Sequence, residues 1–135
     1  MLIGGPGSRP RKALFVLRTA AELLAGVRAE LGAESPKTTA ARAIVLAHMR
    51  RALAEARTGA EAELLASGKG TRCAMNLAAA EDEIIRAIHQ FAVRDVYPVD
   101  NPSGAEAISI AAVGGYGRAT LAPGSDIDLL FILPY

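Results

Sequence analysis

The sequence predicts an α+β fold in which a helical region comes first and two short strands follow. Residues 11–98 place apolar side chains at the three- and four-residue steps of helices, whereas residues 107–133 switch to the two-residue step of strands. Hydrophobic residues make up 51% of the 135-residue chain and charged residues 21%, a balance that excludes general disorder. We therefore expect a flexible lead-in at 1–10, a helical region at 11–98 and a strand-forming region at 99–135.

The charge and hydropathy patterns narrow the classes of function. Fifteen basic residues against fourteen acidic ones give a net charge of +1. This balance does not predict the strong positive electrostatic potential that attracts nucleic acid. No apolar run approaches the roughly 20 residues that span a bilayer. The single cysteine, Cys73, cannot form a disulfide within the chain, which fits a reducing compartment. We expect a cytoplasmic protein without nucleic-acid or membrane partners.

The first two helices are predicted from their apolar spacing and their end signals. Gly32 can cap the C-terminus of the first helix. The second is expected over 37–67, with Ser35 as its N-cap and Pro36 at its first position, and whether Gly59 divides it stays open. Gly68 ends this helix. The expected buried stripe of the first helix is Leu14, Leu17, Ala21, Leu24 and Leu31.

A third helical stretch is expected to run from Thr71 to about Asp95. Tyr97-Pro98 stops it, because the residue before a proline disfavours the α region. Its apolar residues recur at helical spacing and predict one buried face: Leu77, Ile84, Ile85, Ile88, Phe91 and Ala92.

Two strands are expected, over Ala107–Val113 and Ile127–Leu133. Both are apolar on their two faces, a pattern typical of strands buried on both sides. The glycine-rich segment Gly114–Ser125 between them reads as a loop with room for a short helical turn. Because an isolated pair of strands is marginal in water, this sheet looks incomplete.

The loop and the start of the second strand carry the chemistry. Without a Cβ, Gly114-Gly115 lets backbone N–H groups approach a ligand and form a nest for phosphates. Asp126 and Asp128 alternate, so their carboxylates share one strand face, with Cα atoms roughly 6.5–7 Å apart. Mg²⁺ takes one or two carboxylates together with phosphate oxygens and water. The two features together indicate metal-dependent phosphoryl or nucleotidyl transfer.

Each feature also has an ordinary structural interpretation. A glycine pair after a strand is commonly a tight turn, Asp126 can form an Asx-turn, and Asp128 can be a polar edge position. However, Asp128 lies between apolar residues, where an unpaired buried carboxylate would be costly. A dinucleotide-binding glycine motif beginning at Gly115 has Thr120 in place of its third glycine, and no P-loop lysine is present.

The segment VGGYGRATLAPGSDIDLLF resembles the nucleotidyltransferase superfamily signature, in which a glycine pair is followed by two alternating aspartates. Over 113–135 the form is similar to the bifunctional uridylyltransferase/uridylyl-removing enzymes, and 38–53 and 84–102 resemble their helical N-terminal region. The resemblance implies that the two strands begin a nucleotidyltransferase-fold sheet, and that the chain is an N-terminal fragment ending inside that domain.

The resemblance also implies a reaction: transfer of UMP from UTP to a tyrosine of the nitrogen-regulatory protein PII, with release of pyrophosphate. The metal would be Mg²⁺. By position, the resemblance implies that Gly114 and Gly115 contact the UTP phosphates and that Ser125 lies beside the triphosphate. It implies that Asp126 and Asp128 are the catalytic metal ligands. Arg118 is a weaker candidate for a phosphate contact, and its alternative is a solvated loop arginine.

The chain departs from the family pattern in two ways. Ala119-Thr120 stands where the family usually has Gly-Glu, and the third carboxylate expected on a later strand is not within the 135 residues. The uridylyl-removing and glutamine-sensing domains of the family are likewise outside them. Two alternatives therefore stay open: an adenylyltransferase of the type that modifies glutamine synthetase, and a non-catalytic helical interaction module.

The remaining candidates for metal or thiol chemistry are weak. His48 and His89 have no second ligand four residues further along a helix, so we expect neither to bind metal. Cys73 has no neighbouring cysteine or histidine in the sequence and is interpreted as a buried or idle thiol.

Overall fold

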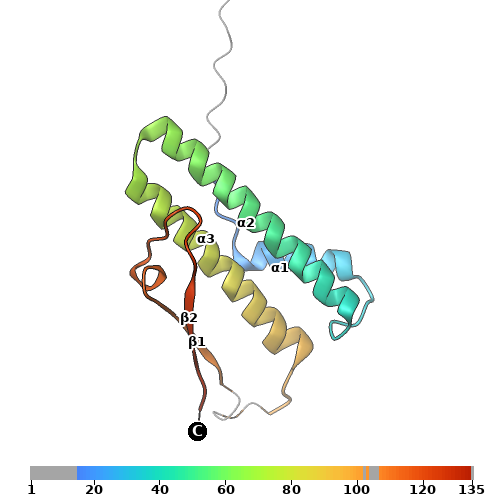
Figure 1. The fold of residues 1–135 in the computed structure, drawn as a ribbon. Coiled ribbons are helices and arrows are strands. Elements are labelled where there is room, and N and C mark those ends of the chain that lie inside the picture. Colours follow the sequence, from blue (N-terminus) through green and yellow to red (C-terminus); the bar gives the residue numbers. More distant parts are fainter. Residues whose placement is uncertain (1–14, 102, 104–106, 135) are drawn as a thin grey trace, which may run out of the picture.

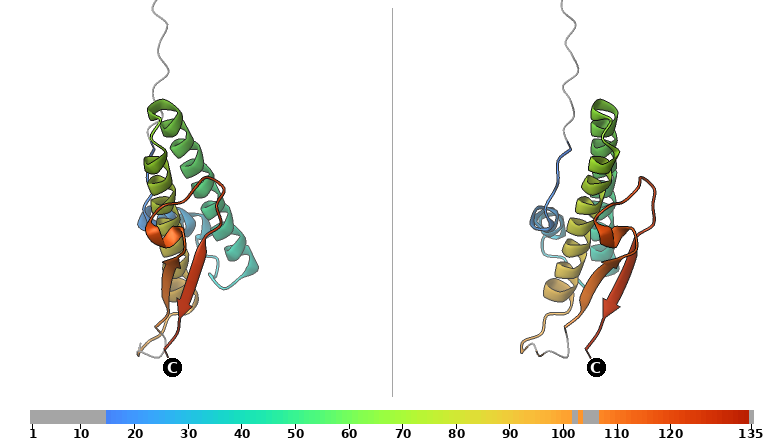
Figure 2. Two further views of the ribbon diagram at one scale, coloured as in Figure 1. Left: turned by 60° about the vertical axis from the view of Figure 1, so that its left-hand side comes forward. Right: turned by 90° about the vertical axis from the view of Figure 1, so that its left-hand side faces the viewer.

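The computed structural model describes residues 15–101, 103 and 107–134. These residues form three layers: the first helix packs on one side of a central helix pair, and a two-stranded sheet with its connecting loop lies on the other (Figures 1 and 2). The predicted α+β class is confirmed. The expected lead-in at 1–10 lies outside the described residues. None of the described helices is long and apolar enough to cross a membrane.

Helix α1 spans Ala20–Leu31 and begins with a capping box. The Thr19 hydroxyl accepts a hydrogen bond from the Glu22 N–H at 3.3 Å, and the Glu22 carboxylate accepts one from the Thr19 N–H at 2.8 Å. Gly32 ends the helix as predicted, its N–H donating to the Arg28 carbonyl.

The predicted stripe of α1 is partly wrong. Leu17 and Ala21 are exposed, and Leu14 lies outside the described residues. The helix starts only at Ala20, so Leu17 belongs to the preceding extended segment. The buried face is rotated relative to the predicted stripe and consists of Ala20, Leu23, Leu24, Val27 and Leu31.

Helix α2 spans Thr39–Ser67, and its N-cap is Thr38 rather than the predicted Ser35. The Thr38 hydroxyl accepts a hydrogen bond from the Ala41 N–H at 3.1 Å. The Ser35 carbonyl instead accepts from the Thr38 N–H, which closes a turn and leaves Ser35 and Pro36 outside the helix. Gly59 does not divide α2, and Gly68 ends it in the left-handed region with φ +69°.

Helix α3 spans Gly70–Phe91 and continues into a π-helical turn over Ala92–Val96, close to the predicted range. Ile88 is exposed, contrary to prediction, because it lines an open hollow between α3 and the start of α2, beside Arg42 and Val45. The three helices enclose the first of two cores, in which small alanines of α2 and α3 sit among larger side chains: Leu23, Leu24, Val27, Met49, Ala52, Ala87 and Phe91.

Strands β1, Ser109–Val113, and β2, Asp128–Ile132, pair in antiparallel register, with Val113 opposite Asp128 and Ser109 opposite Ile132. The expectation that both strands are buried on two faces is wrong. The side chains of Leu130, Phe131 and Ile132 are 51%, 59% and 50% exposed. In the described part of the chain the helices lie on one side of the sheet, and no layer covers the other (Figure 2).

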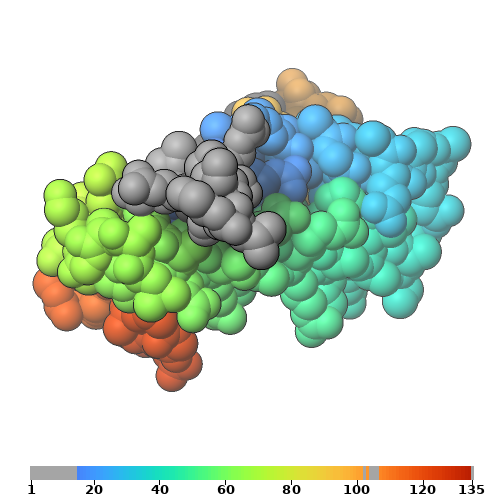
Figure 3. Space-filling view, turned by 90° about the horizontal axis from the view of Figure 1, so that it is seen from above, coloured from blue at the N-terminus to red at the C-terminus, as the bar shows by residue number. Residues whose placement is uncertain are grey.

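A second core joins the helical region to the glycine-rich loop. It contains buried residues from α2, α3 and the loop: Ala60, Cys73, Leu77, Ala78, Tyr116 and Leu121. Leu129 of β2 packs against it. Seen from above, the loop (orange-red) lies directly against the α2–α3 end of the molecule (green; Figure 3). The loop is therefore held by the helices.

Candidate functional site

The turn after β1 places bare backbone beside a carboxylate. Because Val113 pairs with Asp128, Gly114 lies just beyond the end of the ladder, next to the first residue of β2. Gly114 has φ +61°, a left-handed conformation that favours glycine. A Cβ built on it would lie only 2.7 Å from Asp128 Oδ2. The left-handed backbone favours glycine here, and the absence of a Cβ leaves room for the Asp128 carboxylate, so the two predicted halves of the site meet at this point.

Both aspartates are exposed, and neither carboxylate forms a hydrogen bond or ion pair within the part of the chain that the structure describes. The argument that Asp128 would be a costly buried charge is thus wrong, because the outer side of the sheet start is open. Strand β2 begins at Asp128, so Asp126 lies two residues before the ladder. Ionised carboxylates donate no hydrogen bonds, and their oxygens are the ligand type that Mg²⁺ prefers. Two exposed carboxylates therefore fit this metal.

No third ligand joins the two aspartates in the described part of the chain. Within residues 15–101, 103 and 107–134, no group of three or more His, Cys, Asp or Glu side chains is placed to hold a metal ion. Mg²⁺ is commonly bound by only one or two protein carboxylates, and phosphate oxygens and water provide its remaining ligands. Two carboxylates are therefore enough for a site of this kind.

Arg118 lies close to the turn, whereas Ser125 belongs to a separate one. Tyr116–Arg118 forms a single 3₁₀ turn that starts after Gly115, whose carbonyl accepts from the Arg118 N–H at 3.2 Å. The guanidinium nitrogen Nη2 of Arg118 lies 3.8 Å from the position of a Cβ on Gly115. A cation therefore stands over the glycine pair. Ser125 is exposed, and its N–H donates to the Ala122 carbonyl at 3.0 Å.

Three residues that hold the loop in place were not predicted from the sequence. A Cβ on Gly117 would lie 2.7 Å from the Ala112 carbonyl oxygen, so only glycine lets the turn close on β1. Tyr116 and Leu121 are buried, and the Leu121 N–H donates to the Ala74 carbonyl of α3 at 3.1 Å. The available signal was the presence of two large apolar side chains, Tyr116 and Leu121, in a loop composed mostly of small residues.

Ala119, where the family usually has glycine, has φ +56° and is the one non-glycine residue with positive φ in the described ranges. An L-residue in this region costs roughly 1–2 kcal/mol that glycine avoids. We expect Ala119→Gly to raise the free energy of unfolding by about 1 kcal/mol in urea denaturation of the chain. Ala122→Gly, at a residue without positive φ, should lower it. Equal effects of both substitutions would contradict a strained Ala119.

The other candidates have structural surroundings. His48 is buried against α1, with Nε2 2.7 Å from Glu30 Oε2, and its ring lies against Gly26. Cys73 is a free thiol buried in the second core. His89 is half-buried on α3. His48 therefore has a structural role in pairing with Glu30, and Cys73 has one in the packing of the second core.

Comparison with known proteins gives two informative relatives. A bifunctional uridylyltransferase/uridylyl-removing enzyme from Bradyrhizobium sp. strain BTAi1 is 44% identical over 130 residues, covering 96% of this chain and 14% of the relative. An enzyme of the same name from Bradyrhizobium sp. strain ORS 278 is 49% identical over 94 residues, covering 70% of this chain and 10% of the relative. No family model and no solved structure matches the chain. The chain thus spans only a small part of the relatives' length.

Proposed function

The chain is homologous over nearly its whole length to the bifunctional uridylyltransferase/uridylyl-removing enzymes, and we propose that it carries the nucleotide-binding turn and two metal ligands of a uridylyltransferase site. The proposed reaction transfers UMP from UTP to a tyrosine hydroxyl of PII in the cytoplasm. The observation that carries the proposal is the close approach of the Asp128 carboxylate to Gly114, where a Cβ would lie 2.7 Å from Oδ2. It brings a phosphate-binding turn and a cation ligand to one place, as nucleotidyl transfer requires.

The reaction exchanges one phosphorus–oxygen bond for another. The acceptor tyrosine oxygen forms a bond to the α-phosphorus of UTP, the bond to the bridging oxygen of the β-phosphate breaks, and pyrophosphate leaves while the hydroxyl proton passes to solvent. Bound Mg²⁺ would neutralise charge on the phosphates. The residues of this chain would position them: backbone N–H groups of Gly114 and Gly115 face the triphosphate, and Arg118 adds a fixed positive charge.

The residues nearest to the nucleotide and metal divide the tasks between them in this proposal. Asp126 and Asp128 would hold Mg²⁺ from one side, and the glycine pair would hold the phosphates from the other. Ser125, beside Asp126 in the sequence, would lie next to the triphosphate as the family resemblance implies. Both aspartates are exposed, which leaves them accessible to a hydrated cation.

A hybrid enzyme tests the proposal and its alternatives. We define the hybrid enzyme as the relative from strain BTAi1 with this chain in place of its homologous 130-residue segment. We expect it to transfer label from α-labelled UTP to PII in the presence of Mg²⁺, and to do so much faster than from ATP. Preference for ATP with glutamine synthetase as acceptor would favour the adenylyltransferase alternative. No transfer, when the unaltered relative is active, would favour a non-catalytic helical module.

A further inference from the structure

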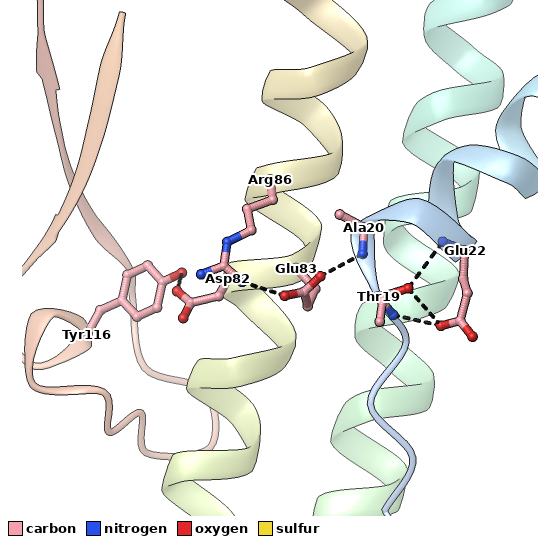
Figure 4. Close-up of polar contacts among 7 residues, drawn as sticks. All are labelled: Thr19, Ala20, Glu22, Asp82, Glu83, Arg86 and Tyr116. Atoms are coloured by element: carbon pink, nitrogen blue, oxygen red, sulfur yellow. Dashed lines mark hydrogen bonds and ion pairs between the residues drawn. The ribbon is translucent and has the colours of Figure 1, made fainter.

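One partly buried polar contact links the helical region to the proposed phosphate-binding turn. The Tyr116 hydroxyl donates a hydrogen bond to Asp82 Oδ1 of α3 at 2.6 Å, across 34 positions of sequence (Figure 4). Tyr116 is only 4% exposed and is surrounded by the apolar residues of the second core. A hydrogen bond to a carboxylate is stronger than one between neutral groups, and more so away from water. The contact therefore fixes where Tyr116 can lie.

Tyr116 directly follows the glycine pair, so its position sets the position of the turn. The turn has little freedom elsewhere: Gly117 is pressed against the Ala112 carbonyl of β1, and the Ala119 N–H donates to the Tyr116 carbonyl at 2.9 Å. At its far end the loop is held again by the Leu121–Ala74 backbone hydrogen bond. A shift of the Tyr116 ring would be passed on to Gly114 and Gly115.

Asp82 is itself held on a helix with a fixed position. The neighbouring Glu83 reaches the opposite side of α3, where its carboxylate accepts a hydrogen bond from the Ala20 N–H at the start of α1 at 2.6 Å (Figure 4). Arg86 forms an ion pair with Glu83. Adjacent residues of α3 therefore bind the loop on one side and α1 on the other.

We propose that Asp82 is a positioning residue for the uridylyltransferase site, acting through Tyr116 on the phosphate-binding turn. This inference rests on the proposed function. Burial raises the pKa of the Tyr116 hydroxyl, and the hydrogen bond to Asp82 raises it further, so the hydroxyl stays protonated and remains the donor. The helical region would thereby contribute to the alignment of UTP without touching it.

The test compares three variants of the hybrid enzyme. We expect Asp82→Ala and Tyr116→Phe to lower kcat/KM for UTP by about tenfold or more, because a small misplacement of a positioning group is costly in rate. The KM for PII should not change, and Asp82→Asn, which keeps an acceptor oxygen, should restore part of the loss. Glu83→Ala is the matched control, since it removes a contact of the adjacent residue on the other side of α3.

Two kinetic outcomes would overturn the inference. One is an unchanged kcat/KM for UTP in Asp82→Ala and Tyr116→Phe. The other is a loss in Glu83→Ala as large as in these two variants, because the effect would then follow general stability. If Asp82→Ala does not fold, the milder Asp82→Asn and Tyr116→Phe variants decide by the same criteria.

Hydrogen exchange on the 135-residue chain separates this inference from the proposed function. We expect Asp82→Ala to speed exchange of the Arg118 and Ala119 amides, which are hydrogen-bonded within the turn, more than exchange in α1. If the unaltered hybrid enzyme transfers no UMP, the proposed function fails, and this exchange pattern alone then decides whether Asp82 positions the turn. Unchanged exchange at both amides would overturn the positioning role.

Discussion

The hybrid enzyme that carries Asp126→Asn and Asp128→Asn together is expected to lose uridylyl transfer by about a thousandfold or more. Bound Mg²⁺ contributes several kcal/mol of charge stabilisation in such reactions, and each 1.4 kcal/mol corresponds to a factor of ten in rate. An asparagine oxygen is a neutral and weaker ligand for a hard cation than a carboxylate. The rate of label transfer from UTP to PII at saturating Mg²⁺ is the measurement.

Asp100→Asn provides the matched control for this change. Asp100 is also an exposed aspartate, but it lies in the connection between α3 and β1, away from the turn. It should leave transfer unchanged, while the single variants Asp126→Asn and Asp128→Asn should each retain less than a tenth of the rate. Because both aspartates are exposed, none of these substitutions should alter the urea midpoint by much. Undiminished transfer by the double variant would refute their role as metal ligands.

The second large effect is expected from Gly114→Ala. The added methyl group would meet Asp128 Oδ2 at 2.7 Å and would also stand at φ +61°. The carboxylate must then move away from the turn, and a displacement of about 1 Å at a reaction centre can cost about a hundredfold in rate. We expect a loss of this size in kcat of the hybrid enzyme, together with a loss of stability of roughly 1–2 kcal/mol from the left-handed backbone.

Gly124→Ala separates the two causes. Gly124 has φ +77°, but no atom lies within 4 Å of the position of its Cβ. This variant should therefore lose similar stability and keep most of its activity. If both alanine variants lost activity equally, backbone strain in the loop would account for the effect, and the contact between Gly114 and Asp128 would have no special importance.

Local signals made several elements predictable. The glycines that end α1 and α2 were identified correctly, because both positions have a positive φ, which glycine adopts without steric cost. The helix starts were harder. Ser35 and Thr38 are both good N-cap residues, and the turn that the Ser35 carbonyl closes selects Thr38. The start of α1 did carry a readable signal, the Thr19–Glu22 capping box.

The burial of the two strands could not be predicted from the spacing of apolar residues in the sequence. An apolar pattern on both sides of a strand indicates what the strand can bury, and burial also needs a second layer. In the part of the chain that the structure describes, helices lie on only one side of β2, and Leu130 and Phe131, which alternate between its two faces, are both exposed. The strand positions were therefore predictable, and their burial was not.

In the candidate site, the residues could be predicted from the sequence, whereas the contacts between them could not. Gly114, Gly115, Asp126 and Asp128 could be selected from residue type and local spacing. The register that brings Gly114 against Asp128 is a property of strand pairing, which the local pattern does not encode. The contact between Tyr116 and Asp82 joins residues 34 positions apart and had no local signal at all.

Paramagnetic broadening tests most directly whether the turn and the two aspartates form one metal–nucleotide site. Mn²⁺, a close substitute for Mg²⁺ at oxygen ligands, would be added with UTP to the isotope-labelled chain while amide signals are recorded. The account predicts that the signals of Gly114, Gly115 and residues 125–128 broaden first, and that Asp126→Asn with Asp128→Asn abolishes this response. Broadening that begins at the amides of Asp82 and Glu83 on α3, or that persists in the double variant, would contradict it.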